Sequence, residues 1–156
     1  MRGTIAKRTT LSLIGLLGLL GLTAAAAIAL AFGRTDDVAA RCFKEQGDTA
    51  IAACTRAIHS GRFRGTELAT IYDNRAIELR QLGDYDRAIA DYSEAIRIDA
   101  ALTGAYTGRG LAYEGKDEIE RAKSDYQKAL AVAPKYDDGA WAHDTARHRL
   151  GVLAGK

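Results

Sequence analysis

Proline is almost absent from this chain of 156 residues, where it occurs once, and phenylalanine occurs only three times. So little of either residue argues against a β-rich chain and against long proline-rich linkers. Hydrophobic residues, in contrast, make up 47% of the chain, which is enough to form the core of one domain. The abundance of alanine and leucine favours helices.

A strong charge of either sign is also missing, because the formal net charge is only +2. Three of the basic residues, Arg2, Lys7 and Arg8, lie near the N-terminus. Without them, 19 basic residues face 20 acidic ones. The part of the chain that we expect to fold is therefore close to neutral, and it lacks the basic footprint of a nucleic-acid-binding protein.

The sequence lacks the motifs of common catalytic sites. It contains no glycine-rich phosphate loop, no H-E-x-x-H and no G-x-S-x-G. His143 and His148 are five residues apart and therefore lie on different faces of a helix, and His59 is isolated. We expect all three to be ordinary helix residues. The sequence thus predicts a protein that is not an enzyme and that has no cofactor or metal site.

Residues 1–34 have the features of an export segment. Basic residues precede an uncharged run from Thr9 to Gly33, a pattern typical of a secretory signal peptide. Residues 11–32 could also span a bilayer, which requires roughly 20 apolar residues. A cleaved signal peptide and an uncleaved anchor both stay open. In either case we expect a bacterial protein exported to the periplasm, either soluble or anchored to the cytoplasmic membrane.

Residues 69–102 align with residues 103–136 without a gap, so the chain repeats itself with a period of 34 residues. Such self-similarity indicates a repeat array. The matched pairs include Tyr72 with Tyr106, Arg75 with Arg109, Ala88 with Ala122, Tyr92 with Tyr126, and Ala95 with Ala129. Because the arginine recurs in both units, it indicates a feature of the repeat and not a local site.

This period and these residues resemble the tetratricopeptide repeat (TPR) family. The resemblance implies an all-α solenoid of helix-turn-helix hairpins. It divides residues 35–156 into a degenerate repeat (36–65), two full repeats (69–102 and 103–136) and a terminal capping helix (137–154). Some positions depart from the family pattern: Ala100 stands where proline is usual, Asp117 where glycine is usual, and Arg75 and Arg109 where leucine is frequent.

Apolar residues at helical spacing predict the helices of these units. The expected ranges are about Thr66 to Leu82, Tyr85 to Ile98, Thr103 to Gly115, Glu118 to Val132 and Asp138 to Leu153. Thr66 is a candidate N-cap for the first of them. In the degenerate unit, we expect Gly47, Asp48 and Thr49 to form a turn before a helix that runs from about Ala50 to Ser60.

The two cysteines, Cys42 and Cys54, lie on either side of this expected turn. Cys42 is five residues before Gly47 and Cys54 is five after Thr49, so in an antiparallel helical hairpin they would face each other. An exported compartment permits a disulfide between them, although two buried free thiols are the alternative. A metal site would need further ligands, and the C-x-x-C spacing of a redox pair is absent.

The TPR resemblance also implies a site, because the inner helices of such hairpins line a concave groove that takes a peptide or a partner helix. The implied groove residues are Thr70, Asp73, Asn74, Ile77, Arg80, Gln81, Thr107, Gly108, Leu111 and Glu114. The terminal helix could contribute Trp141 or Arg149. Asn74 occupies the position of an asparagine that binds a C-terminal carboxylate in chaperone-binding relatives. Gly104 and Gly108 stand where lysine and arginine would complete that clamp, so the clamp is not expected.

We therefore predict a non-enzymatic protein-interaction module or adaptor whose partner is a protein or peptide of unknown identity, with no nucleic acid. Membrane contact would come through residues 11–32 if they are not cleaved. The alternative is a membrane-tethered structural scaffold subunit that assembles through its helix ends and not through the groove. A solvated helix face that binds nothing would leave the same polar pattern.

Overall fold

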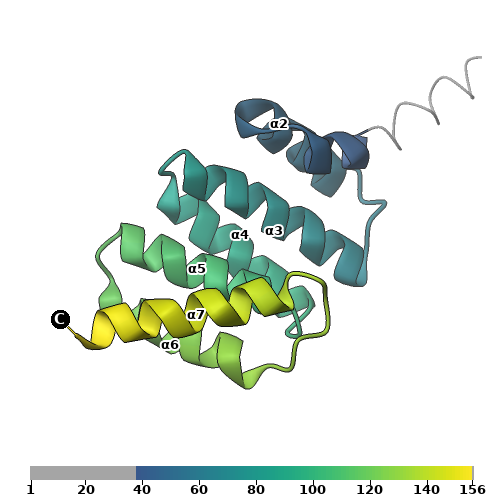
Figure 1. Ribbon diagram of the computed structural model, residues 1–156. Coiled ribbons are helices and arrows are strands. Elements are labelled where there is room, and N and C mark those ends of the chain that lie inside the picture. The colour runs from purple at the N-terminus through teal and green to yellow at the C-terminus, as the bar shows by residue number, and fades with distance from the viewer. Residues whose placement is uncertain (1–37, 156) are drawn as a thin grey trace, which may run out of the picture. The chain divides into compact units, whose positions relative to one another are not determined.

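The computed structural model describes residues 38–155, and all of its regular elements in that range are helices (Figure 1). The first helix spans residues 38–44. The others are α2 (Gly47–His59), α3 (Gly65–Gln81), α4 (Tyr85–Ile98), α5 (Thr103–Gly115), α6 (Ile119–Ala131) and α7 (Gly139–Ala154). The prediction of an all-α solenoid is confirmed.

Successive helices pack against one another as hairpins. The helices α3 and α4 form one pair and α5 and α6 the next, and α4 also contacts α5, so the two pairs stack. On one side, α2 packs against α3. On the other side α7, drawn in yellow, covers α5 and α6 (Figure 1). The inner helices α3 and α5 also contact each other directly, which places them on the same side of the stack.

The bounds of α4 and α5 coincide with the predicted ranges, whereas two local predictions were wrong. Thr66 is not an N-cap, because α3 begins one residue earlier and the cap position is Arg64. The Thr66 hydroxyl instead donates to Asp99 Oδ2 at 2.7 Å and so ties the start of α3 to the end of α4. The break in the degenerate unit falls at residues 45–46, and Gly47 already starts α2 with a positive φ of 60°.

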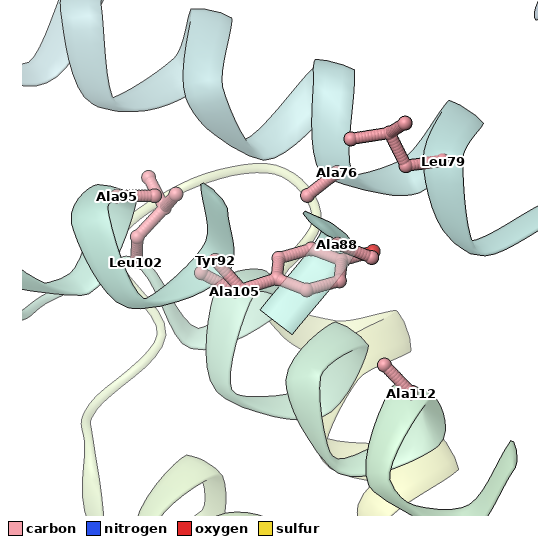
Figure 2. Packing of buried hydrophobic residues seen from close by; sticks show 8 residues of the cluster. All are labelled: Ala76, Leu79, Ala88, Tyr92, Ala95, Leu102, Ala105 and Ala112. Carbon is pink, nitrogen blue, oxygen red and sulfur yellow. The ribbon is translucent and has the colours of Figure 1, made fainter. Parts of the chain in front are cut away.

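Tyr92 and Tyr126 fill equivalent places in the two full repeats, and neither side chain is exposed. The Tyr92 ring lies among small residues from three helices, including Ala76, Ala88 and Ala105 (Figure 2). Small side chains let the helix backbones approach closely, and the large ring then fills the space that remains between them. The repeat sequence thus sets the helix spacing directly.

The repeated arginine forms the same buried contacts in both units. Arg75 donates to both carboxylate oxygens of Asp91 at 2.7 and 2.8 Å, and Arg109 does the same with Asp125 at 2.7 and 2.9 Å. Each arginine also donates to a hydroxyl of the preceding unit, that of Thr55 or Ser93, at 2.9 Å. These residues therefore join the two helices of a hairpin to the hairpin before it.

The turn inside each hairpin also repeats, but with different residues. Gly83 has a φ of 79° and Asp117, 34 positions later, has a φ of 61°. Both turns close with the same pair of backbone hydrogen bonds, from Gly83 and Asp84 in one and from Asp117 and Glu118 in the other. Asp117 therefore carries a left-handed conformation that suits glycine better than any residue with a Cβ.

The two cysteines are joined in a disulfide between helix 38–44 and α2, with a Cα–Cα distance of 4.7 Å. Both side chains are fully buried against Ala53, Ala57 and Ile71. The side-chain amide of Asn74 donates to the Cys42 carbonyl, so α3 holds this hairpin in place. The bridge thereby supports the unit with the weakest repeat pattern.

None of the helices within residues 38–155 is both long and apolar enough to cross a membrane. The predicted signal peptide or anchor, residues 1–34, lies outside the described residues, as do the apolar residues 11–32.

Replacing Asp117 by glycine should raise the free energy of unfolding by about 0.5–1 kcal/mol, because glycine adopts a positive φ without steric cost. Urea denaturation followed by circular dichroism measures the difference. Gln127→Gly, at an exposed position inside α6, is the control and should lower stability by about 0.5–1 kcal/mol. A loss of stability in both variants would contradict the assigned strain at Asp117.

Removing the disulfide should destabilise the protein by about 2–3 kcal/mol in the chain-entropy account of such a short loop. The measurement is the thermal unfolding midpoint with and without reductant. Reductant should lower the midpoint of the wild type but leave that of the Cys42→Ser/Cys54→Ser variant unchanged. Hydrogen exchange should accelerate mainly within residues 38–59, and an equal acceleration in α5 and α6 would show that the bridge acts on the whole stack.

Candidate functional site

A groove of about 370 Å³ lies on the side of the stack formed by the inner helices, and we call it the inner groove. Its walls come from α3, α4 and α5 and from the start of α7. The lining residues are Asp73, Ile77, Arg80, Gln81, Tyr92, Gly104, Gly108, Asp138 and Trp141. The groove therefore draws on both full repeats and on the terminal helix.

Two glycines of α5 make room for the side chains that enter this groove. A Cβ on Gly108 would lie 2.5 Å from Cζ of Tyr92, which is closer than real side chains approach. A Cβ on Gly104 would collide with the carboxylate of Asp138. Because these two positions have no side chains, Tyr92 of α4 and Asp138 at the start of α7 can both extend into the groove.

The polar atoms of the groove are unusual in their lack of partners. Among residues 38–155, four buried side-chain polar atoms make no hydrogen bond, and three of them belong to groove residues. These three are Asp73 Oδ1, Arg80 Nε and Tyr92 Oη. Buried polar atoms without partners are rare because leaving one unsatisfied costs about 1–3 kcal/mol. The arrangement is typical of a surface that completes its hydrogen bonds with a ligand or with water.

The charges of the groove are mainly acidic. Burial and, to a smaller extent, the nearby carboxylate of Asp138 together raise the pKa of Asp73 to about 7, and Arg80 opposes both effects. Burial also raises the pKa of Asp138 and that of the Tyr92 hydroxyl. Two carboxyl groups and one guanidinium thus share a partly desolvated space, and a proton on either carboxyl group reduces their mutual repulsion.

Half of the predicted groove residues do line this site. Five of the ten are found there, and they come mostly from α3: Asp73, Ile77, Arg80, Gln81 and Gly108. Trp141, which was expected as a possible addition, is also present, and 53% of its surface is exposed. Whether these residues contact a peptide stays a prediction.

The remaining five point elsewhere, and three of them are covered by α7. Thr107 is fully buried and donates to the Ala142 carbonyl, Leu111 packs in the cluster around Tyr126, and Glu114 pairs with Arg149. In α3, the Thr70 hydroxyl donates to the Thr66 carbonyl, and Asn74 donates to Cys42. The predicted groove was therefore too long at the end that α7 closes.

Three residues that line the groove are not among the ten predicted ones, namely Tyr92, Gly104 and Asp138. Tyr92 was assigned to the core, and its ring is indeed there, but its hydroxyl lies at the groove. Asp138 could have been noticed as an acidic residue at the start of the terminal helix. Its position over Gly104 depends on how α7 docks, and no repeat pattern determines that docking.

The other hollows of the described residues are weaker candidates for a binding site. Residues 38–155 hold no group of three or more His, Cys, Asp or Glu side chains placed to bind a metal. A hollow at the hairpin turns contains Lys116 and Asp86, which pair with each other. Another, between α2, α3 and α4, contains Arg75 and Asp91, which are also paired. These charged groups are thus already paired within the protein.

Comparison with known families agrees with this geometry. A family model described as TPR repeat matches residues 77–117, and one described as tetratricopeptide repeat matches residues 103–136. Residues 77–136 thus carry the tetratricopeptide-repeat pattern. The helix pairs α3–α4 and α5–α6 are thus TPR hairpins, and the inner groove lies on the face that their first helices share.

Among curated proteins, mouse tetratricopeptide repeat protein 12 is 35% identical over 69 residues, which cover 44% of this chain and 10% of that protein. Yeast heat shock protein STI1 is 28% identical over 99 residues, covering 58% of this chain and 16% of that protein. The TPR chain thus spans only about a tenth to a sixth of the length of these relatives.

Solved TPR domains share the fold. The second TPR domain of human RPAP3, solved in complex with the HSP70 peptide SGPTIEEVD, is 25% identical with a TM-score of 0.57, and the match covers 70% of this chain and 82% of that one. The Arabidopsis OM64 TPR domain is 28% identical with a TM-score of 0.52, covering 65% and 81%. The described helices thus share the fold of these solved TPR domains.

The raised pKa of Asp73 predicts a pH-dependent loss of stability. The folded protein keeps the Asp73 proton up to about pH 7, whereas the unfolded chain releases it near pH 3.8. Unfolding therefore becomes easier as the pH rises through this window, by up to about 4 kcal/mol at pH 7. The charged or titratable groups that face Asp73 are Asp138, Arg80 and Tyr92.

Urea denaturation of the wild type and of Asp73→Asn from pH 4 to pH 8 tests this prediction. The variant cannot ionise at this position, so its advantage over the wild type should grow with pH up to about 7 and then level off. Glu120→Gln, at an exposed site on α6, should show no such growth. An advantage of Asp73→Asn that is constant with pH would mean that Asp73 ionises normally.

Proposed function

We propose that the protein binds an extended segment of a partner protein in the inner groove. The carrying observation is that three buried polar atoms of Asp73, Arg80 and Tyr92 converge on this groove without hydrogen-bond partners within residues 38–155. A peptide backbone and its side chains supply donors and acceptors for such atoms. Solenoid proteins commonly use their concave surfaces in this way.

The apolar part of the groove supports a peptide as the ligand. Ile77 on α3 and the exposed Trp141 on α7 both line it. Exposed aromatic residues beside a groove are typical anchors for protein partners, because they bury a large area with little loss of side-chain freedom. The human RPAP3 domain of similar fold was solved with a bound peptide, which supports peptide binding as the use of this fold here.

We further propose that the protein works in an oxidising, exported compartment, with residues 1–34 as a signal peptide or membrane anchor. The buried Cys42–Cys54 disulfide supports this setting, since structural disulfides persist mainly outside the reducing cytosol. A partner would then be another exported protein. The scaffold alternative, in which the helix ends and not the groove make the contacts, is an outcome of the test below.

In-cell photo-crosslinking with the crosslinker at position 77 should give a discrete adduct, because Ile77 lines the groove. The matched control places it at position 120 on α6, where the Glu120 side chain is 86% exposed. Mass spectrometry of the adduct identifies the partner. Equal adducts from both positions, or none from position 77, would reject groove binding and favour assembly through the helix ends.

A further inference from the structure

The inner groove brings two acidic side chains to one part of its wall, where a bound cation would favour the ionised form of both. Asp73 enters from α3 and Asp138 from the start of α7, and their carboxylates are close enough to raise the pKa of Asp73. Gly104 lies beneath Asp138 and leaves the space for its carboxylate. The two acidic groups therefore approach the same part of the groove from two different helices.

Arg80 is the one basic residue that lines the groove. Its guanidinium opposes the raised pKa of Asp73 and that of the Tyr92 hydroxyl, so its electrostatic effect is shared between these two groups. Neither Asp73 nor Asp138 forms an ion pair with any basic side chain of residues 38–155 at a distance of 4.0 Å or less. This contrasts with Asp91 and Asp125, which are fully paired by arginines elsewhere in the same stack.

We propose that the groove recognises a basic side chain, lysine or arginine, of the bound segment, an inference that rests on the proposed function. The cationic head would donate to Asp73 Oδ1, to the Asp138 carboxylate and to the Tyr92 hydroxyl oxygen. Each of these groups can accept such a bond, and two of them are buried without a partner of their own. Hydrogen bonds between charged groups are stronger than those between neutral ones.

Trp141 gives the same ligand a second contact. It belongs to α7, three residues after Asp138, and it lies at the exposed edge of the groove. The face of an indole ring attracts ammonium and guanidinium groups, and its area packs against their methylene stems. An acidic peptide, in contrast, would place its carboxylates near Asp73 and Asp138 and be repelled by both.

The test is a selection of random twelve-residue peptides, displayed on phage, on the full-length protein. Enriched sequences should share lysine or arginine at one position. Synthetic copies are then compared with versions that carry citrulline or norleucine there, which keep the approximate size of the side chain but remove its charge. The neutral versions should bind at least about 10-fold more weakly by fluorescence polarisation.

Variants of the protein test whether this loss of affinity arises in the groove. Asp138→Asn should weaken the basic peptide about 10-fold but leave the citrulline or norleucine peptide unchanged. Gly104→Ala, which displaces the Asp138 carboxylate, should act in the same direction. Glu120→Gln changes the net charge equally at an exposed site on α6 and should have no effect. Circular dichroism verifies that each variant is folded.

The outcomes separate the two proposals. If enriched peptides crosslink to position 77 but lose nothing on neutralisation, groove binding stands and the recognition of a basic side chain is overturned. If no peptide is enriched, or if crosslinks form equally at positions 77 and 120, the proposed function fails and the inference fails with it. Recognition of the peptide charge by Asp138 is supported only when two conditions hold. Neutralising the peptide and replacing Asp138 must each weaken binding, and replacing Asp138 must not weaken binding of the neutral peptide further.

Discussion

The contact of the Tyr92 ring with Gly108 is the constraint on which both the core and the groove depend. Gly108 has to lack a Cβ because the ring lies 2.5 Å from where that atom would be. The ring in turn fills the space among alanines of α3, α4 and α5 and so fixes their spacing. Tyr126 also lies against a glycine, Gly110, but this residue belongs to its own hairpin and corresponds to Ala76 in the preceding unit. Only the first of these tyrosines also faces the groove, where its hydroxyl lies unpaired.

The polar groups of the stack fall into two classes that differ in how well they are satisfied. Arg75 and Arg109 meet aspartates in two-bond contacts and also bond a hydroxyl of the preceding unit. Breaking either pair would leave a buried charge alone, which typically costs several kcal/mol. Asp73 and Arg80 lie in the same stack but lack such partners at the buried atoms that face the groove. Outside the groove, Thr103 Oγ1 is the one buried side-chain polar atom of residues 38–155 without a partner, so the unsatisfied atoms gather where we propose that a ligand binds.

The sequence was sufficient for the helices because the 34-residue period repeats both packing positions and turns. The bounds of α4 and α5 followed from it directly. It was insufficient where the period fails, as at Thr66, whose hydroxyl bonds Asp99 and caps nothing. It was also insufficient for half of the groove, because Thr107, Leu111 and Glu114 have the groove register but are covered by α7. The docking of α7 depends on contacts that occur only once in the chain.

The groove therefore takes the side chains that distinguish it from other TPR grooves mainly from α7, which is not part of a repeat. Asp73 belongs to a repeat, but Asp138 and Trp141 come from α7, the helix after the last full unit. A TPR array supplies a concave surface, and surfaces of this kind bind many different ligands. The terminal helix α7 covers one end of that surface, where Arg149 pairs with Glu114. It also brings the Asp138 carboxylate and the Trp141 indole to the groove. Two glycines on α5 make this possible, because larger residues at 104 and 108 would exclude the side chains that give the groove its charge.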